Sequence, residues 1–147
     1  MNSEPGPFDV AACTCAGLRR AARAVTQIYD AALRPAGLTA NQFTLLATLE
    51  RAGDAPLTRL AEILVMERTT LTRNLRPLER RGLVAVLRER DRRVRRVTLT
   101  AAGRRLLEEA RPRWARAQSQ VVDELGAEGC SGLRRDLDHL VDLFAGR

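Results

Sequence analysis

A short strand-like segment interrupts a chain whose hydrophobic pattern is otherwise helical. Residues 83–87 are apolar and rich in β-formers, residues 94–100 alternate in part between apolar and polar side chains, and the intervening residues 88–93 are all charged. Two such segments around a short polar connection predict a β-hairpin with a charged tip. Because helical patterns stand on both sides of it, the expected fold class is mainly α with one small β-hairpin.

One long amphipathic helix is expected before the hairpin. Apolar side chains recur at three- and four-residue spacing from an N-cap at Asp9 to about Arg34, where Pro35 and Gly37 end the pattern. Residues 1–8 hold two prolines and a glycine and are expected to form a frayed arm. A helix of this length is too long for the interior of a small globule, so it favours an extended interface.

Three shorter helices are expected next. Thr39 and Gln42 have the spacing of a capping box, which predicts a helix that ends near Gly53. The apolar positions of residues 60–64 predict a short helix, and residues 68–81 predict a further one that ends at a glycine.

Two more helices are expected after the hairpin. Thr100 is a suitable N-cap for a long helix that runs to Gly126 and should kink at Pro112. Gly129 and Gly132 weaken the start of the final helix.

The order of short helix, tight turn, second helix and charged hairpin predicts a winged helix-turn-helix. We therefore expect one structural domain in three parts. Residues 1–38 form an N-terminal arm and a dimerisation helix, residues 39–100 form the winged helix-turn-helix lobe, and residues 101–147 form C-terminal dimerisation helices.

The positive charge of the chain is concentrated in this lobe. All 25 basic residues are arginines, and the formal net charge is +7. Residues 67–96 contain eleven arginines and four acids, whereas the 14 arginines and 14 acids elsewhere cancel. The guanidinium group is a planar, permanently charged fork that suits phosphate and guanine. These arginines could simply form a solvated charged surface. The local excess of positive over negative charge instead favours a polyanion as the binding partner.

The helix over residues 68–81 has one packing face and one polar face. Leu71, Leu75 and Leu78 share the packing face. Threonine and arginine can contact base edges as well as phosphates, so the polar side predicts a recognition helix for double-stranded DNA. The candidate base contacts are Thr69, Thr70, Thr72 and Arg73, the candidate phosphate contacts are Arg76 and Arg80, and Arg68 is a further DNA-binding candidate on this helix.

Several motifs from residue 37 to residue 103 together resemble the MarR family of bacterial and archaeal winged-helix transcriptional regulators. The motifs are Gly37-Leu38-Thr39-x-x-Gln42-Phe43-x-Leu45-Leu46, Leu60-Ala61-Glu62, Thr70-Leu71-Thr72-Arg73-x-Leu75-x-x-Leu78-Glu79-x-x-Gly82-Leu83-Val84 and Asp91-Arg92-Arg93-x-x-x-Val97-x-Leu99-Thr100-x-x-Gly103. The resemblance implies a homodimer whose long helices interleave and whose two lobes bind a pseudo-palindromic operator, most often as a repressor.

The resemblance also implies a role for the hairpin, which is the wing of this family. Asp91 is expected to brace Arg93, which would enter the minor groove, where narrow A·T-rich DNA attracts arginine. Alternatively, Asp91 and Arg93 could belong to an ordinary surface turn with no role in DNA binding. The full set of candidate wing contacts is Arg90, Asp91, Arg92, Arg93 and Arg95.

Three cysteines are candidate redox residues. Cys13 and Cys15 are expected in the first turns of the long N-terminal helix, and Cys130 opens the last helix. A helix N-terminus favours the thiolate. On a helix, residues two apart point to opposite sides, so a Cys13–Cys15 disulfide requires local unwinding. Either cysteine could instead pair with Cys130 of either subunit, and all three could simply pack. Some members of the resembled family sense oxidants through an N-terminal thiol, and we expect oxidation at Cys13 and Cys15 to release the DNA.

No metal or cofactor is expected. Cys13, Cys15, Cys130 and His139 are four zinc-type ligands, but two cysteines one residue apart on a helix cannot clamp one ion without unwinding. A single histidine, no glycine-rich phosphate loop and no paired carboxylates exclude the common enzyme classes.

Two other functions are compatible with the sequence. A small aromatic or anionic ligand could release the DNA from a crevice between lobe and dimer helices, where Arg19, Arg20, Arg23 and Gln27 offer polar groups. The second alternative is an architectural protein that binds DNA without sequence preference. Threonines on the recognition helix disfavour it, because binding to phosphates alone does not require them. No long apolar run and no signal peptide are present, so no membrane association and a cytoplasmic location are expected.

Overall fold

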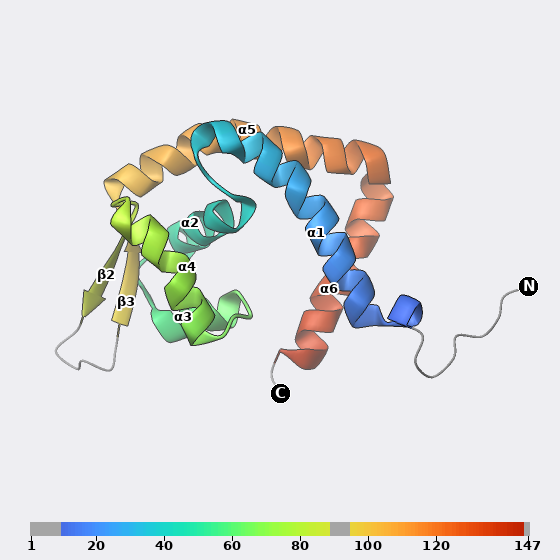
Figure 1. Cartoon of the computed structure of the whole chain (residues 1–147), viewed down its shortest axis with the longest axis horizontal. Coiled ribbons are helices and arrows are strands. Elements are labelled where there is room, and N and C mark those ends of the chain that lie inside the picture. The colour runs from blue at the N-terminus through green and yellow to red at the C-terminus, as the bar shows by residue number, and fades with distance from the viewer. Residues whose placement is uncertain (1–9, 89–94, 146–147) are drawn as a thin grey trace, which may run out of the picture.

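The computed structural model describes residues 10–88 and 95–145, and it has the predicted order of helices around a hairpin (Figure 1). The elements are the 3-10 turns η1 (Val10–Ala12) and η2 (Arg34–Ala36), the helices α1 (Thr14–Leu33), α2 (Ala40–Ala52), α3 (Leu57–Ile63), α4 (Arg68–Arg80), α5 (Ala101–Leu125) and α6 (Ala127–Phe144), and the strands β1 (Ala55–Pro56), β2 (Val84–Arg88) and β3 (Arg95–Leu99).

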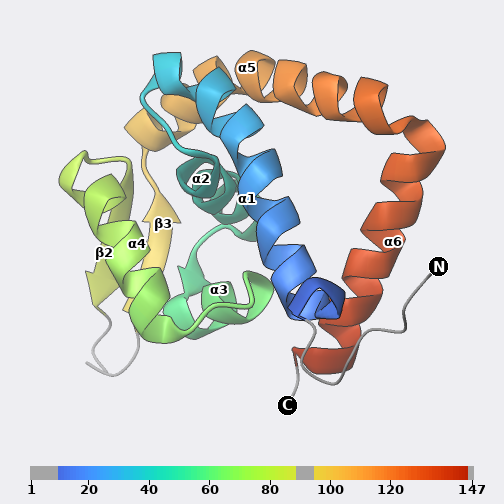
Figure 2. The same ribbon diagram turned by 45° about the vertical axis from the view of Figure 1, so that its right-hand side comes forward.

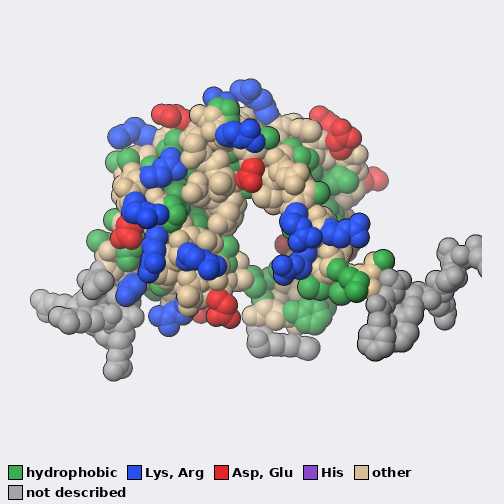
Figure 3. All heavy atoms as spheres, viewed as in Figure 1, with side chains coloured by type: hydrophobic (Ala, Val, Ile, Leu, Met, Phe, Trp, Pro, Cys, Tyr) green, Lys and Arg blue, Asp and Glu red, His purple; other side chains and the backbone are tan. Residues whose placement is uncertain are grey.

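The chain forms a lobe and an arm. The lobe consists of α2, α3, α4 and the three strands, and it packs under the N-terminal half of α5 (Figures 1 and 2). The arm consists of α1, the C-terminal half of α5 and α6. In both views the start of α1 lies near the C-terminal end of α6. Figure 3 shows the molecule hollowed between the lobe and the arm.

The first helix begins later than its periodicity predicts. Cys13 has an extended backbone, with φ −72° and ψ 115°, and separates η1 from α1, which starts at Thr14. Cysteine and threonine are weak helix formers, which accounts for the interruption. The predicted N-cap, Asp9, lies outside the described residues.

The two predicted caps of the lobe are confirmed. The Thr39 hydroxyl accepts a hydrogen bond from the Gln42 amide at 3.2 Å, and the Gln42 side chain accepts one from the Thr39 amide at 3.1 Å. At the start of α5, the Thr100 hydroxyl accepts from the Gly103 amide at 3.0 Å. These bonds satisfy amides that would otherwise lack partners in the first helical turn.

The hairpin is confirmed, but it belongs to a three-stranded antiparallel sheet. The strand order is β1-β3-β2, with Val84 opposite Leu99 and Ala55 opposite Val97. Strand β1 is only two residues long and includes Pro56, so no alternation in the sequence could predict it. The charged tip of the hairpin, residues 89–94, lies outside the described residues.

Leucines form most of the core of the lobe. Leu71, Leu75 and Leu78 are buried, as the periodicity of their helix predicts. The backbone of α5 comes so close to the sheet at Gly103 that a Cβ there would collide with the Leu83 carbonyl oxygen and lie 2.7 Å from a methyl of Leu99. Glycine is therefore required where α5 crosses the hairpin.

The last two helices are present as predicted, with Thr100 as the N-cap and Gly126 as the C-cap of α5. Pro112 lies inside α5, and the helix continues through it to Leu125. Helix α6 begins at Ala127, before both of the glycines expected to weaken it. No helix among the described residues is long and apolar enough to cross a lipid bilayer.

Candidate nucleic-acid interface

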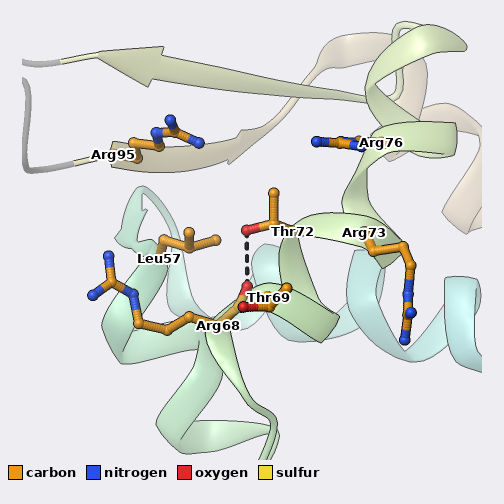
Figure 4. A pocket seen from close by; sticks show the side chains of 7 residues that line it. All are labelled: Leu57, Arg68, Thr69, Thr72, Arg73, Arg76 and Arg95. Atoms are coloured by element: carbon orange, nitrogen blue, oxygen red, sulfur yellow. Dashed lines mark hydrogen bonds between the residues drawn. The ribbon is translucent and has the colours of Figure 1, made fainter.

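An open, basic concavity of about 930 Å³ lies between α4 and β3 (Figure 4). Of the described residues that line it, four are arginines and none is acidic. The lining residues are Leu57, Arg68, Thr69, Thr72, Arg73, Arg76 and Arg95. Such a surface has the charge and the planar donors that a phosphodiester backbone requires.

The packing of α4 determines which side chains reach this surface. Its three leucines are buried against the lobe, so the arginines on the opposite side face solvent. Figure 4 shows Arg76 of α4 and Arg95 of β3 pointing toward each other, whereas Arg73, one turn earlier in α4, points away from Arg95. Figure 3 shows arginines gathered over the same side of the lobe.

The predicted contact residues fall into three groups. The concavity includes the predicted residues Arg68, Thr69, Thr72, Arg73, Arg76 and Arg95. Arg80 is exposed near the end of α4, and Thr70 is half-buried; neither lines the concavity. The remaining predicted wing residues, Arg90, Asp91, Arg92 and Arg93, lie outside the described residues.

Two arginines of the basic segment hold the scaffold together. Arg81 donates to the Gly37 carbonyl at 2.8 Å, which ties the end of α4 to the turn between α1 and α2. Arg96 donates to the Asp54 carbonyl at 2.6 Å, beside β1. Charge counting could not find this role, because it depends on contacts more than 40 residues away in the sequence.

Comparison with known proteins identifies the family. The sequence model of the MarR family matches residues 38–95. The structure of the transcriptional regulator MosR from M. tuberculosis in complex with DNA is 43% identical, covers 89% of this chain and 95% of that one, and superposes with a TM-score of 0.81.

The chain belongs to the MarR family. It is also similar to the transcriptional repressor CouR bound to a 23-mer DNA duplex, with 28% identity, coverage of 95% and 99% of the two chains and a TM-score of 0.79. BpsR from Bordetella bronchiseptica, whose DNA binding is regulated by 6-hydroxynicotinic acid, is 27% identical, with coverage of 93% and 99% and a TM-score of 0.80. No curated protein sequence matches the chain.

The cysteines of this MarR-family chain lie in the arm, away from the basic concavity. Cys13 and Cys15 are exposed, whereas Cys130 is half-buried and its thiol lies 3.8 Å from the Val121 carbonyl oxygen. Cys13 is the N-cap of α1 and not part of the helix, which corrects the sequence prediction. Cys130 lies in the first turn of α6, whereas α1 starts near the other end of that helix (Figures 1 and 2). This arrangement disfavours pairing of Cys130 with Cys13 or Cys15 of the same chain.

An aromatic group joins the arm to the lobe. The Tyr29 hydroxyl of α1 donates to Gln118 of α5 at 2.8 Å. Trp114 stacks on Phe43 of α2 with ring centroids 5.8 Å apart, and the Tyr29 ring lies 6.4 Å from Trp114. Burial raises the pKa of Tyr29, and an electrostatic contribution from Cys130 raises it further. The sequence contained no signal for this cluster, which depends on the crossing of α1 over α5.

An ion pair also connects α5 to the lobe. Arg111 of α5 forms an ion pair with Glu50 of α2 and another with Glu108 at 3.1 Å. The hydrogen bond to Glu50 raises the pKa of Arg111, with a smaller contribution from Glu108. The pair with Glu50 links α5 to α2 of the lobe, whereas the pair with Glu108 lies within α5.

The described part of the chain contains no cluster of three or more histidine, cysteine or acidic side chains that could hold a metal ion.

Proposed function

We propose that this MarR-family regulator represses transcription by binding a pseudo-palindromic operator in double-stranded DNA as a homodimer. The observation that carries the proposal is the concavity between α4 and β3, with four arginines and no acid among its described lining residues. Double-stranded DNA presents closely spaced phosphates, and arginines that displace their counterions supply much of the affinity.

The proposed docking places α4 in the major groove and the wing in the adjacent minor groove. The phosphodiester strand that separates the two grooves then crosses the concavity. Arg68, Arg76 and Arg95 border this path and contact phosphates, while Thr69 and Arg73 face the base edges. Thr70 is half-buried on the other flank of α4, which favours a supporting role over a base contact.

The wing tip is proposed to reach the minor groove through Arg93, with Asp91 as its brace. This assignment rests on the family motif. Arg93→Ala should weaken operator binding strongly and leave the dimer folded, and unchanged affinity in a gel shift at fixed salt would refute the role.

Homodimerisation is supported by the exposed apolar face of the arm. No residue of α6 is buried, and five of its large apolar side chains are exposed, from Leu137 at 40% to Phe144 at 58%. An isolated helix of this length is marginally stable in water. A second copy that covers this face would bury it, so we assign residues 1–38 and 101–147 to the dimer and residues 39–100 to DNA binding.

The DNA-binding proposal is tested by fluorescence anisotropy of the reduced protein on the region upstream of its own gene. We expect that region to bind at least about a thousandfold more tightly than a random duplex of equal length. Arg73→Ala should lose most of this preference, whereas Arg134→Ala, a matched loss of charge on α6, should retain it. Equal affinity for both duplexes would instead identify a non-specific architectural protein.

We propose that oxidation of Cys13 and Cys15 releases the DNA. A hydroperoxide takes two electrons from the pair: one thiolate attacks the peroxide and becomes a sulfenic acid as an alcohol or water leaves, and the other thiol displaces water to form the disulfide. Because Cys13 is already extended and only Cys15 is helical, the bond requires only the first turn of α1 to unwind. The distorted α1 would then shift one lobe relative to the other.

Peptide mass spectrometry under non-reducing conditions tests this switch. After peroxide treatment we expect a Cys13–Cys15 disulfide and a loss of operator affinity that dithiothreitol reverses. Cys13→Ser and Cys15→Ser should each abolish the response, whereas Cys130→Ser should keep it. Full DNA binding with both thiols oxidised would exclude the switch.

Release by a small ligand is the second candidate. It is favoured by the similarity to BpsR, whose DNA binding responds to an aromatic acid. Arg19, Arg20 and Arg23 are exposed on α1 and could hold an aromatic carboxylate. Titration of the reduced protein with 6-hydroxynicotinate separates the two candidates, since only ligand release would occur in excess reductant.

A further inference from the structure

Thr72 differs from the other threonines of α4 in what it offers to DNA. Its hydroxyl donates to the Arg68 carbonyl of the same helix at 2.8 Å. The hydroxyl proton is therefore engaged by the backbone, so the side chain offers DNA its methyl and an acceptor oxygen but no donor. We propose that Thr72 determines specificity by contacting the 5-methyl group of a thymine. This inference rests on the proposed binding of an operator by α4.

The surroundings of Thr72 suit an apolar contact. In Figure 4 its hydroxyl points toward Arg68, while its methyl projects into the concavity between Arg76 and Arg95. Leu57 lines the same concavity and is the other apolar side chain there. A small apolar spot thus lies within a ring of arginines that hold phosphates.

The position of a thymine methyl in the major groove matches this spot. The 5-methyl group projects from the edge of the pyrimidine that is closest to its own phosphodiester strand, and it is the apolar feature of the groove. Thr72 lies on the flank of α4 that faces β3, along the proposed path of that strand. The flanking arginines therefore fix the strand while the Thr72 methyl packs against the thymine.

Thr69 provides the contrast within the same concavity. Its side chain is exposed, and within residues 10–88 and 95–145 its hydroxyl has no hydrogen-bond partner. A free hydroxyl can bond a base edge or a phosphate. One threonine therefore presents a hydroxyl and the other, one turn later, presents a methyl.

The test is a double-mutant cycle between protein and DNA. The duplex comes from selection of a random library by the reduced wild-type protein. Each thymine of its half-site is then replaced singly by deoxyuridine, which removes only the methyl. We expect one position where the replacement weakens wild-type binding about four-fold per half-site, the factor given by burial of one methyl-sized group.

The variants separate the methyl from the hydroxyl. Thr72→Ser keeps the hydroxyl and should bind the thymine and deoxyuridine duplexes equally. Thr72→Val keeps the methyl and should still discriminate between them. Thr69→Val, the matched control, should lose affinity for both duplexes and keep the discrimination at that position.

Two results would overturn the inference while the proposed function stands. One is a selected duplex in which no thymine position responds to deoxyuridine. The other is a response that Thr72→Ser retains, because the methyl would then contact another group. Failure of the selection to enrich any sequence would instead refute the proposed operator binding itself.

Discussion

Arg73 lies in α4 and Arg81 directly follows that helix, but the two have different surroundings. Arg73 lines the basic concavity, whereas Arg81 donates to the Gly37 carbonyl at 2.8 Å. Net charge alone treats the two as equal. In the proposed complex Arg73 faces the DNA, whereas Arg81 holds the end of α4 against the turn between α1 and α2.

Measurement of DNA affinity against salt concentration should separate these two arginines. Each lost phosphate contact lowers the slope of log K against log salt by about one. Arg73→Ala should remove most of the preference for the operator, because Arg73 faces the base edges in the proposed complex, and Arg76→Ala, at a proposed phosphate contact, should reduce the slope. Arg81→Ala should leave the slope unchanged and lower stability by about 1 kcal/mol, the net value of one hydrogen bond. A reduced slope in Arg81→Ala would show that it also binds DNA.

The pKa of Tyr29 gives a prediction about alkaline stability. Its ordinary value is 10.0, and burial raises it in the folded state. Above pH 10 the unfolded chain loses the phenol proton before the folded chain does, so the free energy of unfolding should fall as pH rises through that range. The chain has one tyrosine and no lysine, so no other phenol and no side-chain amine titrates near pH 10.

Tyr29→Phe is the control for that prediction. It should remove the pH dependence above pH 10 in urea unfolding and lower stability at neutral pH by about 1 kcal/mol, because the bond to Gln118 is lost. An identical fall in both proteins would assign the alkaline effect to another group.

At the level of secondary structure, the helices could be predicted where local chemistry decides them. The Thr39 and Thr100 caps and the leucine spacing of α4 are local signals, and all three are confirmed. Strand β1 and the contacts of Tyr29 and Arg81 depend on segments distant in sequence, which a periodicity cannot encode. The late start of α1 was missed because apolar spacing continues through Cys13.

The crossing of α5 over the hairpin should be the position most sensitive to added volume. Gly103→Ala would place a Cβ against the Leu83 carbonyl, which also accepts from the Thr100 amide and so is held in place. We expect a loss of about 3 kcal/mol in urea unfolding.

Gly17→Ala is the matched comparison, since nothing lies within 4 Å of a Cβ there. It should be neutral or stabilise α1 by up to about 1 kcal/mol. Equal stability of the two variants would contradict the close approach at Gly103.

A single copy of the chain leaves an apolar face of the arm exposed. Helix α6 packs against the end of α5 and leaves Leu133, Leu137 and Val141 on an exposed apolar face. The lobe, in contrast, has a closed core. The functional unit that this distribution favours is a dimer with two basic lobes.

A charge on this face should therefore disrupt the dimer. Leu137→Asp would place a carboxylate in the proposed interface, where desolvation costs several kcal/mol. Sedimentation should show monomers, and operator affinity should fall by more than tenfold. Arg134→Ala on the same helix should remain dimeric, and a dimeric Leu137→Asp would place the interface elsewhere.

The most direct test of the central claim is selection from a random duplex library by the reduced protein, followed by sequencing. The account predicts enrichment of an inverted repeat whose half-sites are centred about one helical turn apart, since a two-fold dimer presents two α4 helices. No enriched sequence, or a single half-site without its repeat, would contradict it.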